Sequence, residues 1–235
     1  PSGTGTSSSV EALAVYDDGD GPSLFAAGQF TTAGGITVNY VARWDGDEWH
    51  TVGDPVDPGF SYKVETLAVF DDGSGASLYA GGQFAWAGKN STSPDVVNHI
   101  ARWDGGLWTA LDDGVAIGTP GAVYTLSPYD NNGTPLLIVG ASTSTIGSVP
   151  ANNLGSWDGT SWSTLDGPHG EGVNFRPVTA TSYDDGDGNS LFIGGGFKTS
   201  GGVPSLAIGQ WRCTIPQPAL IFESGFETGQ LNDWS

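Results

Sequence analysis

The chain has 235 residues, with 26 acidic against 7 basic side chains and a formal net charge of −19 at pH 7. A surface this acidic repels nucleic acid and anionic lipid, so we expect neither as a partner. No apolar run reaches the length of a membrane-spanning helix, so we do not expect membrane insertion.

The composition favours a location outside the cell. The sequence contains no methionine, not even at its start, and therefore resembles a processed mature product. The excess of acidic groups suits solubility, cation binding or a saline setting. We therefore expect an extracellular or cell-surface protein.

One pattern of 54 residues recurs four times along the chain. Each copy has an aromatic residue before a turn, a second marker further on, and then a tryptophan. The second copy carries five extra residues within "AGKNSTSPDVVNH". The markers are, in order, Tyr16, Phe30 and Trp44; Phe70, Phe84 and Trp103; Tyr129, Thr143 and Trp157; and Tyr183, Phe197 and Trp211. A fixed period with one loop insertion indicates four copies of one structural unit.

Each unit contains four short apolar runs, which we interpret as strands. In the second unit they cover residues 64–70, 77–84, 98–103 and 107–111, and turn residues separate them. Four strands in each of four units predict an all-β fold, a β-propeller of four four-stranded blades over residues 1–213. Residues 214–235 form a C-terminal tail. A β-solenoid is the structural alternative, although its repeats are usually much shorter.

An acidic turn joins the first two predicted strands of a unit, as in "YDDGDG" at 16–21. Glycine supplies the positive φ of a tight hairpin, and the aspartate side chain caps the turn. Closely spaced carboxylates also suit calcium, which takes about six to eight oxygen ligands, although hairpin chemistry alone accounts for them. The calcium candidates are Asp17, Asp18, Asp20, Asp71, Asp72, Asp184, Asp185 and Asp187.

The last unit lacks its fourth strand, because its second tryptophan belongs by register at Pro216. The nearest replacement is "ALIF" in the tail, which either completes its own last blade or pairs with the open edge of a neighbouring molecule. Pairing between molecules would build dimers or filaments. The single cysteine, at the start of the tail, is either an inert buried thiol or a bridge between molecules. The assembly candidates are therefore Cys213, Ala219, Leu220, Ile221 and Phe222.

A double glycine closes the second strand, and two aromatic residues follow a few positions apart, as in "LYAGGQF" and "ARWDG" with a later tryptophan. This pattern resembles the kelch repeat, especially as it occurs in secreted bacterial surface proteins and fungal cortical polarity-marker proteins. The resemblance covers roughly residues 10–213. It implies propeller blades but no particular function, because kelch propellers serve as enzymes, adhesins and adaptors.

The sequence offers little for an enzyme. The three histidines, His50, His99 and His169, occupy different positions in their units and form no metal-binding pattern. No nucleophile elbow, phosphate loop or Cys-x-x-Cys motif occurs. The carboxylates recur with the repeat, which favours a structural role, although a glycosidase-like pair stays open. We expect a non-enzymatic protein with no cofactor beyond the calcium considered above.

Two functions remain as hypotheses. The first is an extracellular structural or adhesive module that associates with itself into oligomers or filaments by strand addition. The second is a lectin-like propeller that binds an extracellular glycan through loop aromatics such as Trp86, whose counterpart in the first unit is Thr32. Two glycosylation sequons, at Asn90 and Asn132, fall in predicted loops.

Overall fold

The structure of the protein, a computed structural model, describes residues 5–88, 95–115, 121–167, 170–184, 188–212 and 221–222. Every regular element in these ranges is a β-strand, and antiparallel pairing joins the strands into sheets. The expectation of an all-β chain is therefore confirmed.

Four sheets of four antiparallel strands form the body of the molecule, one sheet for each sequence unit. The first sheet contains β1 (Val10–Asp17), β2 (Pro22–Gly28), β5 (Val41–Trp44) and β6 (Trp49–His50). The second contains β7 (Val64–Asp71), β8 (Ala76–Gly82), β11 (Ile100–Trp103) and β12 (Trp108–Ala110). The third contains β13 (Val123–Asn131), β14 (Thr134–Ala141), β17 (Leu154–Trp157) and β18 (Trp162–Thr164). The fourth contains β21 (Pro177–Asp184), β22 (Asn189–Gly195), β25 (Ile208–Arg212) and β26 (Ile221–Phe222).

Short hairpins that the sequence pattern did not predict lie between the second and third strands of every sheet. Their strands have two residues each, which is too short for an alternation of apolar and polar residues to be recognised. They are β3 (Thr32–Ala33) with β4 (Ile36–Thr37), β9 (Trp86–Ala87) with β10 (Asp95–Val96), β15 (Thr145–Ile146) with β16 (Val149–Pro150), and β23 (Thr199–Ser200) with β24 (Val203–Pro204). A further hairpin, β19 (Asp166–Gly167) with β20 (Gly170–Glu171), precedes the fourth sheet.

A tryptophan pair closes the outer edge of each of the first three sheets. In the second sheet Trp103 lies opposite Trp108, with ring centroids 5.4 Å apart. In the fourth sheet Phe222 lies opposite Trp211, eleven positions along the chain (211 to 222) instead of five (103 to 108). The tail therefore supplies the fourth strand of its own last sheet after a longer connection, as one of the two alternatives from the sequence proposed.

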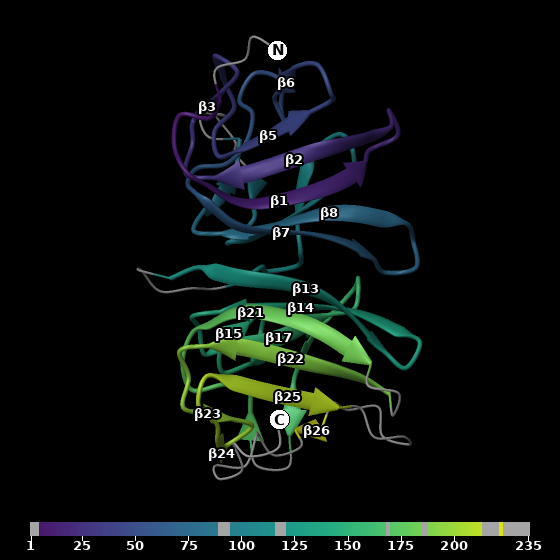
Figure 1. Cartoon of the computed structure of the whole chain (residues 1–235), viewed down its shortest axis with the longest axis vertical. Coiled ribbons are helices and arrows are strands. Elements are labelled where there is room, and N and C mark those ends of the chain that lie inside the picture. The colour runs from purple at the N-terminus through teal and green to yellow at the C-terminus, as the bar shows by residue number, and fades with distance from the viewer. Residues whose placement is uncertain are drawn as a thin grey trace, which may run out of the picture.

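The four sheets form an open arc. Their first strands, β1, β7, β13 and β21, lie side by side in chain order, and each contacts the next. The outer strands of the first and last sheets point toward opposite ends of the molecule (Figure 1). Completion of the last sheet by the tail does not bring β21 beside β1, so the described residues do not close a ring. The repeat period fixes the number of sheets, whereas packing sets the angle between neighbouring sheets.

The hydrophobic core lies mainly between neighbouring sheets. Tyr16 and Phe25 of the first sheet share one buried cluster with Leu78, Trp103 and Trp108 of the second. Equivalent clusters lie between the second and third sheets and between the third and fourth. Tryptophans of the second, third and fourth sheets thus fill the space between neighbouring sheets.

A glycine in the linker allows the chain to cross from one sheet to the next. Gly59 has a φ of +80°, and a Cβ atom there would collide with the backbone carbonyl of Asn39 in the preceding sheet. The Gly88 amide donates a hydrogen bond to the Gly59 carbonyl at 2.9 Å. The same hydrogen bond recurs from Gly147 to Gly114 and from Gly201 to Gly172. One backbone joint therefore repeats between successive sheets.

Candidate functional site

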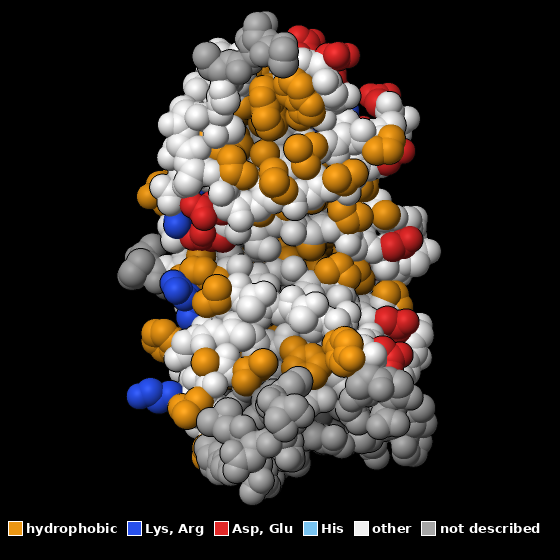
Figure 2. All heavy atoms as spheres, in the orientation of Figure 1, with side chains coloured by type: hydrophobic (Ala, Val, Ile, Leu, Met, Phe, Trp, Pro, Cys, Tyr) orange, Lys and Arg blue, Asp and Glu red, His pale blue; other side chains and the backbone are white. Residues whose placement is uncertain are grey.

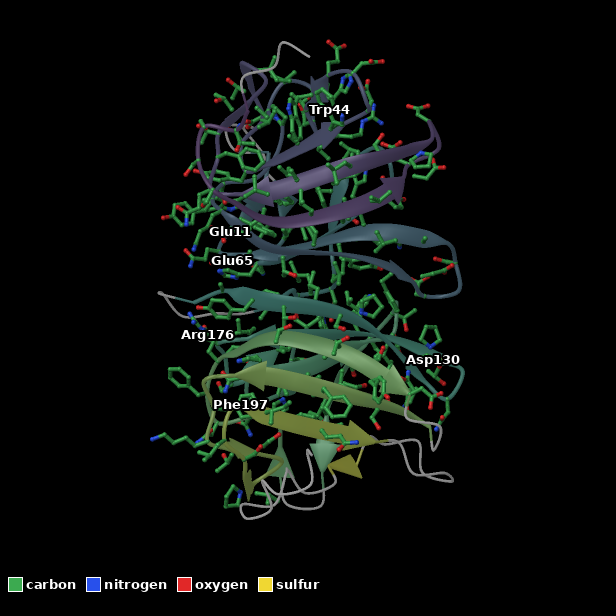
Figure 3. The ribbon with its side chains drawn as sticks, in the orientation of Figure 1. Glu11, Trp44, Glu65, Asp130, Arg176 and Phe197 are labelled. Atoms are coloured by element: carbon green, nitrogen blue, oxygen red, sulfur yellow. The ribbon has the colours of Figure 1, made fainter. Side chains whose placement is uncertain are left out.

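The outer face of the first sheet is apolar, and no other sheet of the described chain packs against it. Val15 on β1 is 65% exposed, whereas Val69, its equivalent on β7, is partly buried against the inter-sheet core. Trp49 is half-buried, whereas its equivalent Trp108 is only 2% exposed. Figure 2 shows hydrophobic side chains gathered over this N-terminal sheet, where Figure 3 labels Trp44. We call this surface, formed by Leu13, Val15, Leu24, Trp44 and Trp49, the tryptophan face.

None of the described elements covers the outer face of the fourth sheet either. Tyr183 on β21 is 61% exposed, whereas the equivalent Tyr129 of the third sheet is 2% exposed. Tyr183 and Phe192 form an edge-to-face ring pair at 6.5 Å, and the equivalent Tyr16 and Phe25 form a tilted ring pair at 6.0 Å within the first inter-sheet core. We call the surface formed by Tyr183, Phe192 and Ile208 the tyrosine face. The two ends of the arc therefore present two different apolar surfaces.

A shallow pocket lies between the first two sheets, on the side where their first strands begin. Its volume is about 320 Å³, and its lining consists of Gln29, Tyr40, Tyr62, Lys63 and Gln83. The rings of Tyr40 and Tyr62 lie 6.0 Å apart at a tilt of 49°. Two flat rings beside carboxamides, which both donate and accept hydrogen bonds, suit a ligand with several hydroxyl groups.

An ion pair and a hydrogen bond hold two of the side chains that line this pocket. Lys63 Nζ lies 2.6 Å from Glu65 Oε1, and Gln83 Nε2 donates to the same carboxylate oxygen at 3.4 Å. Glu11, Glu65 and Arg176 lie along the same side of the arc, opposite Asp130 (Figure 3). The Arg176 guanidinium lies over the ring of Tyr124, 4.7 Å from its centroid. The side on which the first strands begin thus combines aromatic and charged groups of both signs.

The calcium candidates in the first two acidic turns stabilise the turns themselves. One carboxylate oxygen of Asp17 accepts hydrogen bonds from the Gly19 and Gly21 amides, at 2.9 and 3.0 Å. Asp71 accepts the matching bonds from the amides of Gly73 and Gly75. These contacts confirm the predicted capping of the turns by aspartate.

The second aspartates of these turns have other partners. Asp18 forms an ion pair with Arg43 at 2.8 Å. Asp72 accepts hydrogen bonds from both the amide and the hydroxyl of Ser74. Burial raises the pKa of Asp72, but the hydrogen bonds from Ser74 outweigh this effect, so the pKa is lowered. Asp20 and Asp184 are exposed.

No group of three His, Cys, Asp or Glu side chains within the described ranges converges on a position that could hold a metal ion. Calcium binding stays a prediction. Five candidate residues lie outside the described residues, namely Asp185, Asp187, Cys213, Ala219 and Leu220. Ile221 and Phe222 form β26.

Two of the histidines have structural partners, and His169 lies outside the described residues. His50 Nε2 lies 2.6 Å from Asp45 Oδ2, and the amides of Glu48 and Asp47, followed by His50, hold the pKa of that carboxyl well below its usual range. His99 Nδ1 lies 2.9 Å from the Val115 carbonyl, and burial lowers the pKa of this imidazole. Neither histidine faces the pocket.

Trp86, the ligand-binding candidate from the sequence, lies exposed in the β9 hairpin and does not line the pocket. The sequence pattern does not single out Tyr40 and Tyr62, which the fold brings together from a turn of the first sheet and the following linker. Tyr40 occupies a turn position with positive φ that His99 and Asn153 take in the next two units. This departure of an aromatic residue from the repeat is the signal that would have pointed to it.

Comparison with known proteins adds no identification. No protein-family model matches the chain, and neither a curated protein nor a solved structure matches it. In the described part of the chain no helix is long and apolar enough to cross a membrane. The class that the fold defines is an all-β protein built from four repeated four-stranded sheets.

Proposed function

We propose that this protein is a non-enzymatic, extracellular β-propeller-type module of the kelch kind, with a structural or adhesive role that depends on self-association. The observation that carries the proposal is the pair of bare apolar faces at the ends of the arc. Large exposed apolar surfaces on folded proteins mark interaction sites. Neighbouring sheets cover the equivalent residues at the three internal contacts.

The proposal of a non-enzymatic role is supported by the structural contacts that the turn aspartates form. The aspartates of the first two turns accept hydrogen bonds from their own backbone, and Asp18 is paired with Arg43. An acid or base for catalysis needs a free position beside a substrate. The first aspartate of the turn recurs at the same position of each unit, and none of these carboxylates lines the pocket.

Association through sheet faces is better supported than strand addition. Within the described residues, the outermost strands of the four sheets have two or three residues each. Such short edges are poor templates for a strand from another molecule. The tail strand β26 already pairs with β25, which leaves the faces as the surfaces available for association.

Sedimentation equilibrium of the full chain over a wide concentration range tests this proposal. We expect the average mass to rise with concentration. Two charged copies repel one another, and salt screens that repulsion, so added salt should strengthen the association. A single-chain mass at every concentration and salt level would contradict self-association.

A second candidate function is binding of a carbohydrate or another polyhydroxylated ligand, and the Tyr40–Tyr62 pocket favours it. A glycan array with the full chain tests this candidate. Any bound glycan should lose affinity for a Tyr62→Ala variant, whereas Trp86→Ala, outside the pocket, should bind as the unmodified protein does. An array without binding at high protein concentration would exclude the glycans displayed.

A further inference from the structure

We propose that the tyrosine face of one copy of this chain docks onto the tryptophan face of a second copy, head to tail, so that two arcs together complete one ring. The inference rests on the proposed function, because it names the partner and the surfaces for self-association. It derives from the three contacts between sheets that the structure already contains.

Each internal contact pairs the same two surfaces. The earlier sheet contributes an aromatic residue from its first strand and apolar residues from its second and third strands. Neighbouring sheets bury these residues at all three contacts. They are Tyr16, Phe25 and Val41; Phe70, Tyr79 and Ile100; and Tyr129, Ile138 and Leu154. By register, the next members of this series are Tyr183, Phe192 and Ile208, which form the tyrosine face.

The later sheet contributes a leucine from its second strand and aromatic residues from its outer strands. At the first contact these are Leu78, Trp103 and Trp108, and at the second they are Leu137, Trp157 and Trp162. One period before Leu78 lies Leu24, and the tryptophans one unit earlier are Trp44 and Trp49. These three residues belong to the tryptophan face. One end of the arc therefore carries the surface that the earlier sheet contributes to an internal contact. The other end carries the surface that the later sheet contributes.

A hydrogen bond gives the docking a defined register. Tyr16 Oη donates to the Ala76 carbonyl at 3.1 Å, and Tyr129 Oη donates to the Asn189 carbonyl at 2.8 Å. Both carbonyls belong to the first residue of the second strand in the next sheet. The equivalent position in the first sheet is Pro22. The Tyr183 hydroxyl should therefore donate to the Pro22 carbonyl of the second copy.

The shape of the arc favours a second copy over closure within one chain. The first and last sheets point toward opposite ends of the molecule, so the two faces of one chain do not meet (Figure 1). Two arcs of four sheets give eight sheets, which lies within the range of about four to eight blades known for closed propellers. Contacts of one face with a different face form a closed ring when the rotation returns to its start.

Sedimentation velocity of four forms of the full chain tests the inference: the unmodified protein, Tyr183→Asp, Val15→Asp and the control Val56→Asp. Val56 is 91% exposed in the linker between the first two sheets and belongs to neither face. We expect the unmodified protein and the control to form two-chain species. Each face variant should associate at least about tenfold more weakly, because a carboxylate would be buried in an apolar contact. The altered side chains are exposed in one chain, so circular dichroism should show normal folding.

Mixing distinguishes head-to-tail docking from contacts between identical faces. Tyr183→Asp keeps its tryptophan face, and Val15→Asp keeps its tyrosine face, so an equimolar mixture should recover a two-chain species. The milder Tyr183→Phe, which removes only the hydroxyl but at both contacts of the ring, should weaken association roughly fivefold to a hundredfold. Association that survives both face variants would overturn this interface and leave self-association standing. A protein that never leaves the single-chain state would overturn both.

Discussion

The hydroxyl of Tyr129, in the first strand of the third sheet, donates a 2.8 Å hydrogen bond to the backbone carbonyl of Asn189 in the fourth sheet. Tyr183 occupies the same place one unit later, but its side chain is 61% exposed because no further sheet among the described residues covers it. Two tyrosines at equivalent positions of successive units thus have different environments, which makes them a matched pair for experiments.

Removal of the hydroxyl should affect stability at only one of these positions. Tyr129→Phe should lower the free energy of unfolding by about 0.5–1.5 kcal/mol, because it removes a partly buried hydrogen bond. Tyr183→Phe should leave the stability of a single chain unchanged. Urea unfolding at low protein concentration measures both values. Equal losses would show that the hydroxyl of Tyr129 does not stabilise the contact between sheets.

The tryptophans should differ in the same way. Trp108 is buried, with its ring 4.7 Å from that of Phe60, and its change to Ala should cost about 3–5 kcal/mol. Trp49→Ala should cost clearly less in a single chain, because Trp49 is only half-buried on the free face. Thermal or urea unfolding of both variants compares the two costs. A Trp49 variant as unstable as the Trp108 variant would contradict the open arc.

The linker glycine should be irreplaceable where the backbone approaches it. Gly59 and Gly133 have similar φ values, +80° and +86°, but only a Cβ at Gly59 would meet other atoms. Gly133→Ala should cost about 1 kcal/mol for the strained backbone alone, and Gly59→Ala should cost more because it also collides with the Asn39 carbonyl. Unfolding curves of the two variants measure the difference. Equal costs would mean that the linker shifts freely.

Acid should weaken the turns between the third and fourth strands. Hydrogen bonds from the Gly106 and Leu107 amides lower the pKa of Asp104, and the pKa values of Asp45 and Asp158 are lowered as well. A carboxyl whose pKa is lower in the folded state stabilises the fold above its unfolded pKa of about 3.9, and this contribution is lost as the pH falls through the folded value. Stability should therefore decline as the pH falls below about 4.

A triple variant, with Asp45, Asp104 and Asp158 each changed to Asn, isolates this effect. The Asn side-chain oxygen still accepts hydrogen bonds but does not titrate. The free energy of unfolding should depend less on pH in this variant than in the unmodified protein between about pH 5 and pH 2, a range around the ordinary Asp pKa of about 3.9. Identical pH dependence would show that these three carboxylates do not control acid stability.

The sequence predicted the sheets well because glycine turns and paired tryptophans recur at a fixed period. It also found the tail segment that pairs beside Trp211. The period could not show that the arc stays open, since the rotation between sheets follows from packing. It also could not show the pocket, because Tyr40 and Tyr62 depart from the repeat and meet only in the folded chain.

The most direct test of the account is a structure of the associated protein by electron cryomicroscopy. The account predicts a closed ring of eight sheets from two chains, with Trp44 and Trp49 buried under Tyr183 and Phe192 of the other copy. Associated particles in which both end faces remain in solvent, or in which identical faces meet, would contradict it.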